Sequence, residues 1–423
     1  MTTQDKANAF DWAALVTLSA MAIVPLLLAG DGDFTFSDAS RHAMDGVFVL
    51  DACAEKPVQD PIGWAKRYYL TSPALGIGRY PPLLAVVQAP FYALLGVSAF
   101  TARLAGLIVW IAGLFFFYES VRTQTGRAGA FLASAALAAG PASVRWGAEA
   151  MLELPSTSFL LAGTYFYLKY LSQGSRWMLV CATSLVCMGG WTKQPAALLL
   201  VAMAVHLVWS KKLVLRDALP AGVCAGLLLV PLVVLSVLFG KANFAIVSGL
   251  GRTYPIWSAD NWLYYVHQVP RWYLGWPLLV FLAAGGIFAI AGKMRKESRF
   301  PLVWVLVFYI FFSTIGLKSS RLAMYWTPGL AWLAGIGFAC CVGYARRWIV
   351  VLATFTAIAA VAMTYVHALQ RVPVMGNELL QVASRVMSFS PERVLYVGPQ
   401  NGTFIFRLRE VAGRNRPVTI RPL

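Results

Sequence analysis

The sequence predicts an all-α polytopic membrane protein with about 11 transmembrane helices, and three observations support this class. First, 59% of the 423 residues are hydrophobic and only 13% are charged, whereas soluble globular chains are about 45–50% apolar and about 25% charged. Second, apolar stretches of the roughly 20 residues that a spanning helix needs recur along the chain. Third, basic residues cluster in the short loops between these stretches, which is the charge pattern that orients membrane proteins.

Eleven apolar runs are the candidate spans: 12–30, 101–119, 129–147, 155–172, 177–191, 195–210, 217–240, 276–292, 300–317, 325–343 and 348–368. Residues 1–11 carry two acids and one Lys, and no small-residue cleavage site follows the first run. We therefore expect that run to be a retained helix rather than a cleaved signal peptide. The net charge of +17 belongs to the loops of a membrane protein, so we expect a lipid bilayer as partner and no nucleic acid.

A twelfth apolar run, 82–96, decides the topology. If it crossed the membrane, five basic clusters that follow it would lie outside, and if it lies along the outer surface, all five lie inside. Its Pro-Pro start and its length of 15 residues also suit a helix at the interface. The sequence thus predicts 11 spans, an inside N-terminus and an outside C-terminus.

This topology leaves three sizeable outer segments, at 31–100, 241–275 and about 370–423. The second is rich in Trp and Tyr, which fits either an aromatic belt at the membrane interface or a surface on which sugar stacks, and both interpretations stay open. We divide the chain into a transmembrane module, 1–370, and a small C-terminal α/β domain, 371–423. That domain is too small to be stable without packing on the membrane part.

The C-terminal segment shows patterns of short elements. Residues 376–387 predict an amphipathic helix. Residues 393–397 and 403–408 predict two strands joined by a turn at 398–402, where Gly, Pro and Asn gather.

The acidic residues are few and unevenly placed. Seven of the 18 fall within 31–60, and of these we interpret Asp31, Asp33 and Asp60 as solvated loop residues. Glu149 and Glu153 follow the span 129–147, lie four residues apart and therefore share one face of a helix. Because an acid costs roughly 2.5–3.5 kcal/mol at the centre of a spanning helix, acids near the membrane call for a reason.

Several cations also fall on the outer side, against the usual bias. Arg103 opens the span after the surface helix, Lys193 lies between two apolar runs, and Lys318 and Arg321 share one loop. Each long side chain taken alone could extend to the interface without a function. Together they predict an anionic ligand at the outer interface, for which phosphate is the natural candidate.

The sequence lacks the motifs of several other chemistries. The four His residues, at 42, 206, 267 and 367, have no metal-ligand spacing. There is no phosphate-binding loop, dinucleotide fingerprint or serine-nucleophile elbow, which argues against a nucleotide-using enzyme. His42 lies near Asp38 and Arg41, where it could act in catalysis or bind an acceptor, but we interpret it as an ordinary polar loop residue.

An ordered set of short elements resembles a known family. The elements are Asp38, Tyr80-Pro81-Pro82-Leu83, Gly96-Val97-Ser98-Ala99-Phe100-Thr101-Ala102-Arg103-Leu104, Arg145 with Glu153-Leu154-Pro155, Thr192-Lys193, and Lys318 with Arg321. Over about residues 10–345 the chain resembles the polyprenyl-phosphate-sugar-dependent glycosyltransferases of the GT-C superfamily, and most of all the protein O-mannosyltransferase and aminoarabinose-transferase group. Ala39 follows Asp38 where the family often has Asp-Glu, and Glu153 replaces the usual second Asp, but both positions keep a carboxylate.

The resemblance implies a GT-C fold and an inverting transfer of sugar from a polyprenyl phosphate to a hydroxyl of a glycan, lipid or protein. It implies an outer, periplasmic active site in a bacterial inner membrane. Asp38 is expected as the general base and Glu153 as the second catalytic acid. The expected substrate-binding residues are Arg41, Tyr80, Arg103, Arg145, Glu149, Lys193, Lys318, Arg321 and Tyr325. A divalent metal, used by some relatives, is a possible cofactor without an evident site.

Two other functions stay open at this point. A transporter or flippase of lipid-linked sugars should line a path through the bilayer with polar residues. Here the predicted spans are nearly free of charge and the acids gather at one face, which favours an enzyme. A structural assembly subunit would predict no effect of substituting Asp38 or Lys193.

Overall fold

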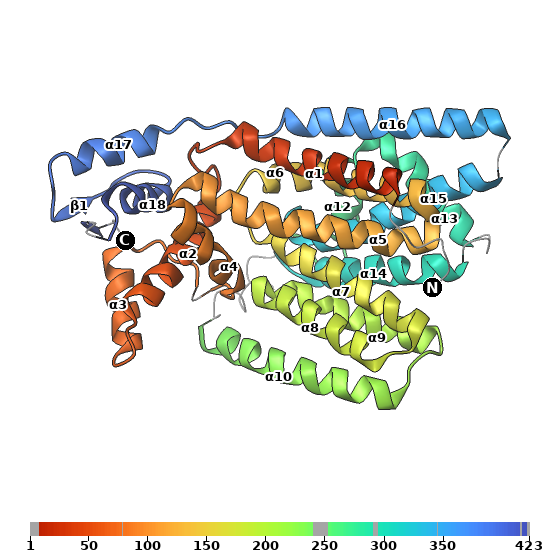
Figure 1. The fold of residues 1–423 in the computed structure, drawn as a ribbon, viewed down its shortest axis with the longest axis horizontal. Coiled ribbons are helices and arrows are strands. Elements are labelled where there is room, and N and C mark those ends of the chain that lie inside the picture. Colours follow the sequence, from red (N-terminus) through yellow and green to blue (C-terminus); the bar gives the residue numbers. More distant parts are fainter. Residues whose placement is uncertain are drawn as a thin grey trace.

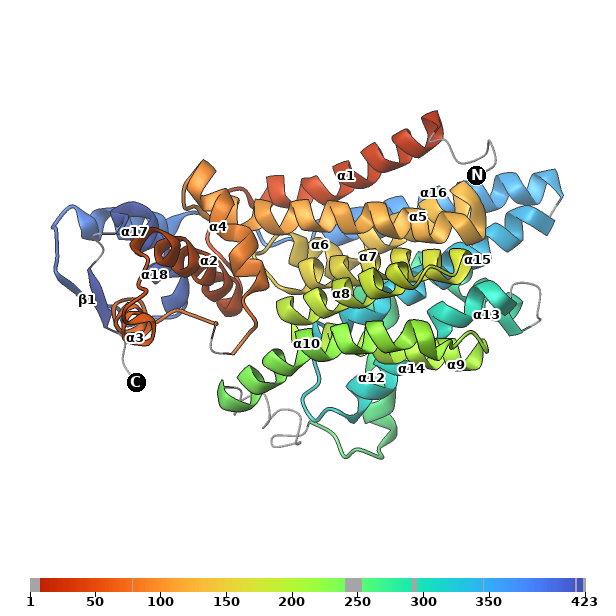
Figure 2. The same ribbon diagram turned by 60° about the horizontal axis from the view of Figure 1, so that its bottom comes forward.

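The computed structural model describes residues 8–77, 79–239, 253–290, 295–344, 346–414 and 417–420, and most of these residues are helical. Figures 1 and 2 show long helices running side by side as a bundle, with shorter helices and the C-terminal segment gathered at one end. The opposite end of the bundle holds the start of α1 (Figure 1).

The long helices account for the apolar runs of the sequence. They are α1 (Ala9–Ala29), α5 (Ala99–Ala139), α7 (Glu153–Gln173), α8 (Arg176–Thr192), α9 (Leu199–Trp209), α10 (Leu215–Phe239), α13 (Leu279–Ile290), α14 (Arg295–Thr314), α15 (Thr327–Tyr344) and α16 (Arg347–Leu369). The element α5 consists of two helices that meet at Gly126, whose φ of 72° is in the left-handed region that favours glycine. The short helix α6 (Pro141–Gly147) follows it.

A test of helix length and hydropathy agrees with a multi-pass membrane protein. Among the described residues, five helices are long and apolar enough to cross a membrane, or six if a pair bent by 106° at 259–273 and 276–289 counts as one span. Other bundle helices, such as α9 and α14, are shorter apolar helices. The membrane class is therefore confirmed, and the count of eleven spans stays a prediction.

Backbone contact between helices explains part of the packing in the bundle. A Cβ atom at Gly285 would collide with the main-chain carbonyl oxygen of Leu333, and one at Gly337 would collide with that of Phe281. The helices α13 and α15 thus approach each other so closely that only glycine fits at these positions. Small residues serve this purpose in membrane helices, where close van der Waals packing holds neighbouring helices together.

The first outer segment is mostly helical. It contains α2 (Ser37–Glu55), α3 (Pro61–Thr71) and α4 (Leu83–Leu95). Asp60 caps α3 by accepting a hydrogen bond from the Gly63 N–H and so serves as a helix cap at the surface. The helix α4 coincides with the run 82–96 and packs beside α2 at the end of the bundle (Figures 1 and 2). This arrangement favours a non-crossing helix, which stays a prediction.

The second outer segment is described only in part, because 240–252 lie outside the described residues. Its remainder forms α12 (Ala259–Gln268) and the short helices η2 (Val269–Tyr273) and η3 (Trp276–Leu278). The hydroxyl of Tyr273 donates to the carbonyl of Ser320 at 2.8 Å, and Trp326 lies edge-on to the rings of Tyr265 and Tyr273. These aromatic residues therefore pack against the loop that carries Arg321.

The C-terminal segment holds two helices and two short strands. They are α17 (Glu378–Met387), β1 (Arg393–Leu395), α18 (Asn401–Ala412) and β2 (Val418–Ile420), and β1 pairs with β2 in parallel. The predicted strand at 403–408 is wrong, because these residues form the first half of α18 and are all buried. A short apolar run cannot be assigned from periodicity alone, and here packing against α2 and α17 requires a helix.

Buried ion pairs fasten α18 to the first outer segment. The Arg407 guanidinium, which is fully buried, donates from Nε to Asp33 at 2.8 Å and from Nη1 to Glu410 at 2.7 Å. Arg409 lies 2.6 Å from a carboxylate oxygen of Asp51. Asp33 is only 2% exposed, so its interpretation as a solvated acid was wrong. Asp31 also pairs with Arg407, at 3.4 Å, and is not a purely solvated residue either.

We predict that Arg407→Gln lowers the unfolding free energy of the C-terminal segment by about 3–5 kcal/mol, because removal of one partner leaves buried carboxylates uncompensated. Limited proteolysis and thermal unfolding of the detergent-solubilised protein measure this loss. The exposed Arg385 of α17, which packs on Phe389, provides the control Arg385→Gln. If Arg407→Gln and Arg385→Gln resisted proteolysis and heat equally well, the stabilising role of Arg407 would be contradicted.

Candidate functional site

Asp38 lies where the chain turns from α1 into the first outer segment. It is the second residue of α2 and is 8% exposed. Its Oδ2 atom accepts hydrogen bonds from Arg321 Nη1 at 3.0 Å and from the Tyr80 hydroxyl at 3.3 Å. Its Oδ1 atom accepts no hydrogen bond from the part of the chain that the structure describes. One carboxylate oxygen is therefore available to accept a proton.

Glu153 begins α7 and is fully buried. The negative charge is favourable at this position, because the N-terminal end of a helix carries partial positive charge. Its Oε1 atom lies 2.5 Å from Lys193 Nζ and 3.2 Å from Arg321 Nε. Its Oε2 atom is buried without a hydrogen-bond partner among the described residues.

Arg321 joins the two carboxylates. It contacts Asp38 through Nη1 and Glu153 through Nε, and the planar guanidinium group suits such a double contact because its N–H groups diverge in one plane. The group also packs over the ring of Phe36, 4.7 Å from the centroid. We call Asp38, Glu153, Lys193 and Arg321 the carboxylate–cation cluster.

Tyr80 and Tyr325 border the cluster. Tyr80 donates to Asp38, and the Lys193 ammonium lies 5.9 Å from the centroid of its ring. Tyr325 belongs to the short helix η4 (Leu322–Trp326), which directly follows Arg321, and is fully buried. A polar group of a bound molecule would satisfy Glu153 Oε2, which has no partner among the described residues.

The cluster keeps Asp38 ionised. Burial favours the neutral acid, but the positive charge of Arg321 and the hydrogen bond that it donates outweigh burial and lower the pKa of Asp38 below its ordinary value. For Tyr80, burial and the charge of Asp38 raise the pKa of the phenol. At neutral pH the tyrosine thus remains a proton donor to the carboxylate.

Arg103 and Lys318 lie outside the cluster, although the sequence suggested both as ligand-binding cations. The Arg103 guanidinium donates to the main-chain carbonyls of Gly30, Gly32 and Ala148, at 3.1, 2.8 and 2.9 Å. The Lys318 ammonium donates to three carbonyls at the end of α14 and so caps that helix. Both cations are occupied by the backbone, which explains their burial without a ligand.

Arg145 and Glu149 form a second, neighbouring ion pair at 3.3 Å, to which Thr35 also hydrogen-bonds. The ring of Trp146 packs edge-on to Phe36 at 5.5 Å, and Phe36 carries Arg321 on its ring. Because Arg145 packs over the ring of Trp146, the ion pair is linked to Arg321 of the cluster through two aromatic residues that pack against each other.

Arg41 makes no contact with the cluster among the described residues. Its side chain lies beside the start of α18, since a Cβ atom at Gly402 would be 3.9 Å from Arg41 Cγ. The prediction that Arg41 shares a binding site with Asp38 therefore has no support in the geometry.

His42 is a site neighbour whose interpretation as an ordinary loop residue was wrong. It lies one helical turn after Asp38 on α2, is 3% exposed and packs edge-on to the Tyr80 ring at 4.8 Å. Asp45, one turn further, lies 3.9 Å from His42 Nδ1 and accepts the main-chain N–H of Gly76 at 2.8 Å. The spacing 38, 42, 45 places these side chains on one face of a helix, a signal hidden because the segment was expected to be a loop.

The described residues do not favour a metal site at the cluster. They contain no group of three or more His, Cys, Asp and Glu side chains that could hold an ion. Arg321 lies between Asp38 and Glu153, and together with Lys193 it already balances the charges of both carboxylates. The residues present therefore do not fit a divalent metal, and no step of the chemistry below is assigned to one.

Comparison with known proteins supports the resemblance on which the site was predicted. Residues 79–238 match the sequence model of the family described as dolichyl-phosphate-mannose-protein mannosyltransferase. This range includes Tyr80, Glu153 and Lys193 but neither Asp38 nor Arg321. A search of curated protein sequences finds no match.

Solved structures share the fold. ArnT from Cupriavidus metallidurans bound to undecaprenyl phosphate has a TM-score of 0.54 and 17% identity over 96% of this chain and 79% of its own. AglB from Archaeoglobus fulgidus, in complex with an inhibitory peptide and a dolichol-phosphate, has a TM-score of 0.60 and 12% identity over 97% and 64%. Arabinofuranosyltransferase AftD from Mycobacteria has a TM-score of 0.54 and 14% identity over 93% and 30%. The family match and these folds together confirm the predicted resemblance to the GT-C superfamily.

Proposed function

We propose that this chain is an integral membrane glycosyltransferase that moves a sugar from a polyprenyl-phosphate donor to a hydroxyl acceptor, with inversion, at the outer face of the membrane. The observation that carries the proposal is the carboxylate–cation cluster. Asp38 provides an ionised carboxylate beside two cations, Lys193 and Arg321. Such a site holds both a proton acceptor and groups that stabilise a departing phosphate.

The reaction needs a base because a hydroxyl is a weak nucleophile. The acceptor oxygen attacks the anomeric carbon of the donor sugar while its proton passes to Asp38 Oδ1. The bond between the anomeric carbon and the phosphate oxygen breaks, and its electron pair leaves with the polyprenyl phosphate. A single displacement of this kind inverts the configuration, whereas a covalent sugar–enzyme intermediate would retain it.

Lys193 and Arg321 are the candidate partners of the leaving phosphate. Negative charge grows on the phosphate oxygen as the bond breaks, and cations already in place stabilise that charge without reorganisation. Both cations now contact Glu153, which holds them at a fixed position. We assign Glu153 the role of orienting these cations, with its unpartnered Oε2 atom directed to the acceptor or the sugar.

The relatives support a lipid-linked donor. ArnT is bound to undecaprenyl phosphate, and AglB is in complex with a dolichol-phosphate and a peptide. By analogy, the donor here is a sugar on a long isoprenoid phosphate, and the acceptor is a hydroxyl of a glycan, a lipid or a protein. The GT-C fold alone does not determine function, so the cluster itself is the stronger support.

The distribution of charge supports an outer active site in a bacterial inner membrane. Basic residues concentrate at the end of the bundle opposite the cluster: Arg122 and Arg127 pair with the first turn of α1, Lys169 lies near the end of α7, and Lys212 lies in the loop after α9. Cytoplasmic loops carry such an excess, and this supports the proposed location of the cluster on the outer side. The α/β segment 371–423 would then be periplasmic.

The rate should depend on pH as expected for a base of low pKa. Because the pKa of Asp38 is lowered, the deprotonated form persists to lower pH, and kcat/KM should stay level down to about pH 4 and fall only below it. Initial rates measured between pH 4 and 8 test this prediction. An acid limb centred near pH 6.5 would instead assign the base to a group such as an imidazole.

Analysis of cell envelopes tests the proposed function in the producing organism. Mass spectrometry of envelope glycans and lipids, with and without this chain, should reveal one sugar that is lost with the chain and restored by the wild type. The variant Asp38→Asn should fail to restore it. Identical envelopes in the presence and absence of the chain would contradict the proposal.

A further inference from the structure

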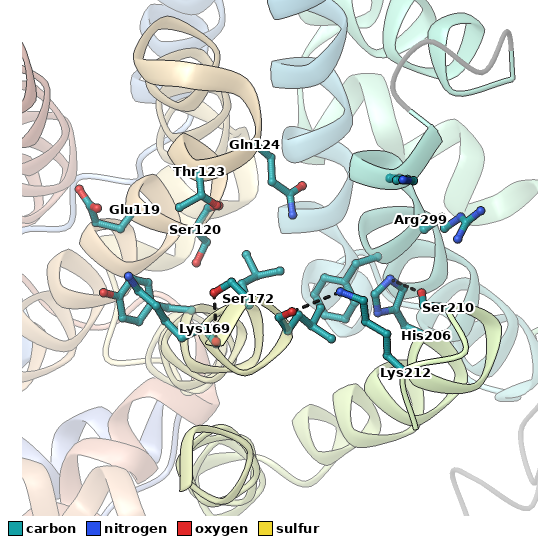
Figure 3. A pocket seen from close by; sticks show the side chains of 15 residues that line it. Glu119, Ser120, Thr123, Gln124, Lys169, Ser172, His206, Ser210, Lys212 and Arg299 are labelled. Atoms are coloured by element: carbon teal, nitrogen blue, oxygen red, sulfur yellow. Dashed lines mark hydrogen bonds between the residues drawn. The ribbon is translucent and has the colours of Figure 1, made fainter. Parts of the chain in front are cut away.

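A second polar site lies at the end of the bundle opposite the carboxylate–cation cluster. A cavity of about 730 Å³ opens there between α5, α7, α9 and α14. Figure 3 shows the side chains that line it, which come from all four helices and from the loop after α9. None of the residues that form this cavity belongs to the cluster described above.

The lining carries a marked excess of positive charge. Four cations, Lys169, Lys212, Lys296 and Arg299, contribute to the walls. Glu119 is the only acid among the described lining residues, and it is paired with Arg122 at 2.7 Å. Among the side chains that the structure describes, no carboxylate forms an ion pair with any of the four cations. Among the described side chains, the cavity therefore lacks the counter-charge that such a concentration of cations calls for.

The cations are held in place and retain hydrogen-bonding capacity. Arg299 packs over the ring of Trp209, 5.6 Å from its centroid, and its Nε atom is buried without a hydrogen-bond partner among the described residues. Lys212 donates to the carbonyl of Leu171 at 3.2 Å, and Lys169 lies over the ring of Tyr165. An ammonium group has three N–H donors, so Lys212 can bind an anion while it keeps this contact.

Apolar side chains in and beside the cavity indicate whether its anion is part of a lipid or free in water. Leu168, Leu171 and Phe300 also line the cavity. On α9, which contributes His206 to the wall, Val208 and Trp209 are exposed. Ends of spanning helices lie at the depth of lipid headgroups, where exposed apolar side chains contact acyl chains. A basic cavity between membrane helices next to such a surface suits a lipid phosphate rather than a phosphate free in water.

We propose that this cavity binds the phosphate headgroup of an anionic membrane lipid, with Lys212 and Arg299 as its principal contacts. The site is separate from the proposed transferase reaction. A bound lipid would neutralise the cations and tie together α5, α7, α9 and α14 on the side of the membrane that does not carry the active site.

Native mass spectrometry of the purified full-length protein in detergent tests the proposal with phosphatidylglycerol, phosphatidylcholine and inorganic phosphate as probes. We expect one tightly held phosphatidylglycerol, bound at least about tenfold more tightly than phosphatidylcholine. Lys212→Gln and Arg299→Gln should each weaken it by about fivefold, the effect of one basic residue near an anionic lipid. The control is Arg176→Gln at the same end, since Arg176 packs on Trp177 but does not line the cavity.

The results of these binding measurements distinguish a lipid phosphate from free inorganic phosphate as the ligand. Loss of phosphatidylglycerol in the two cavity variants but not in Arg176→Gln would support the lipid site. Inorganic phosphate that binds with the same dependence on Lys212, while the lipid does not, would overturn the lipid as ligand. Equal binding of both lipids, or no effect of Lys212→Gln, would also overturn the proposal. Lys212 is exposed, so this variant should fold and can decide the question even if Arg299→Gln does not.

Discussion

Replacing Asp38 by Asn is expected to lower kcat for sugar transfer by at least about 100-fold, the lower end of what a positioned general base contributes. The amide has nearly the shape of the carboxylate and can still accept a hydrogen bond from Arg321 or Tyr80. It cannot accept the proton of the acceptor hydroxyl. The protein should therefore insert and purify normally, bind donor with a similar affinity and turn it over slowly.

A matched control shows whether the loss of activity is specific to Asp38 or follows the removal of any outer-segment aspartate. Asp260 is also the second residue of its helix, α12, but it is exposed, so Asp260→Asn should keep wild-type turnover. Asp38→Glu should recover part of the activity, because a carboxylate is present at a shifted position. Near-wild-type kcat in Asp38→Asn would remove Asp38 from the mechanism.

Replacing Lys193 by Met is expected to lower kcat by about 100- to 1000-fold, the effect of removing one preplaced charge that stabilises a transition state. Lys193 is buried, and its ammonium contacts Glu153, so the change also leaves Arg321 as the one described cation beside that acid. If the ammonium binds the phosphate only as it leaves, kcat should fall more than the affinity for donor.

Lys318→Met is the corresponding control at a second buried lysine. The Lys318 ammonium caps α14 through three carbonyls, and none of its described contacts is with the cluster. Its removal should lower thermal stability, while kcat per folded molecule stays near the wild-type value. If the two variants lost turnover equally at equal stability, the assignment of Lys193 as a phosphate partner would be wrong.

The contrast between these two lysines shows what could be read from the sequence. The sequence predicted both as outer cations near span ends, and both suited a phosphate ligand equally well. The structure shows that the two lysines have different partners. Lys193 contacts the carboxylate of Glu153, which is 40 residues away in the sequence. Lys318 instead contacts main-chain carbonyls at the end of α14, a few residues before it. Which group a long cation reaches depends on how helices pack, and that information is spread over the whole chain.

The four residues of the cluster were predictable for a different reason. Asp38, Glu153, Lys193 and Arg321 each lie outside the apolar runs but close to the end of one, and the predicted topology assigns all of them to one membrane face. Charged residues at the ends of spans, and basic loops at the other membrane face, are strong signals of topology because burying charge in the bilayer is costly. The ion pairs that the structure shows among them are the outcome this reasoning expects.

The outer segments were harder to predict than the bundle. The segment around His42 and Asp45 was expected to be a loop, although its side chains follow a helical spacing on α2. The run at 403–408 was expected to be a strand and is part of α18, where Arg407 is buried among acids of the first outer segment. In both cases contacts between distant segments decide the local structure, and local patterns carry little of that information.

The central claim is that the cluster transfers sugar and does not merely move a lipid-linked sugar across the membrane. Its most direct test is the purified protein reconstituted in vesicles with a polyprenyl phosphate carrying a labelled sugar and an extract of envelope glycans and lipids as acceptor. We predict that the label moves to a hydroxyl of the acceptor, that polyprenyl phosphate is released in equal amount, and that Asp38→Asn does neither. Label that changes leaflet but stays on the polyprenyl phosphate, equally in wild type and Asp38→Asn, would contradict this account.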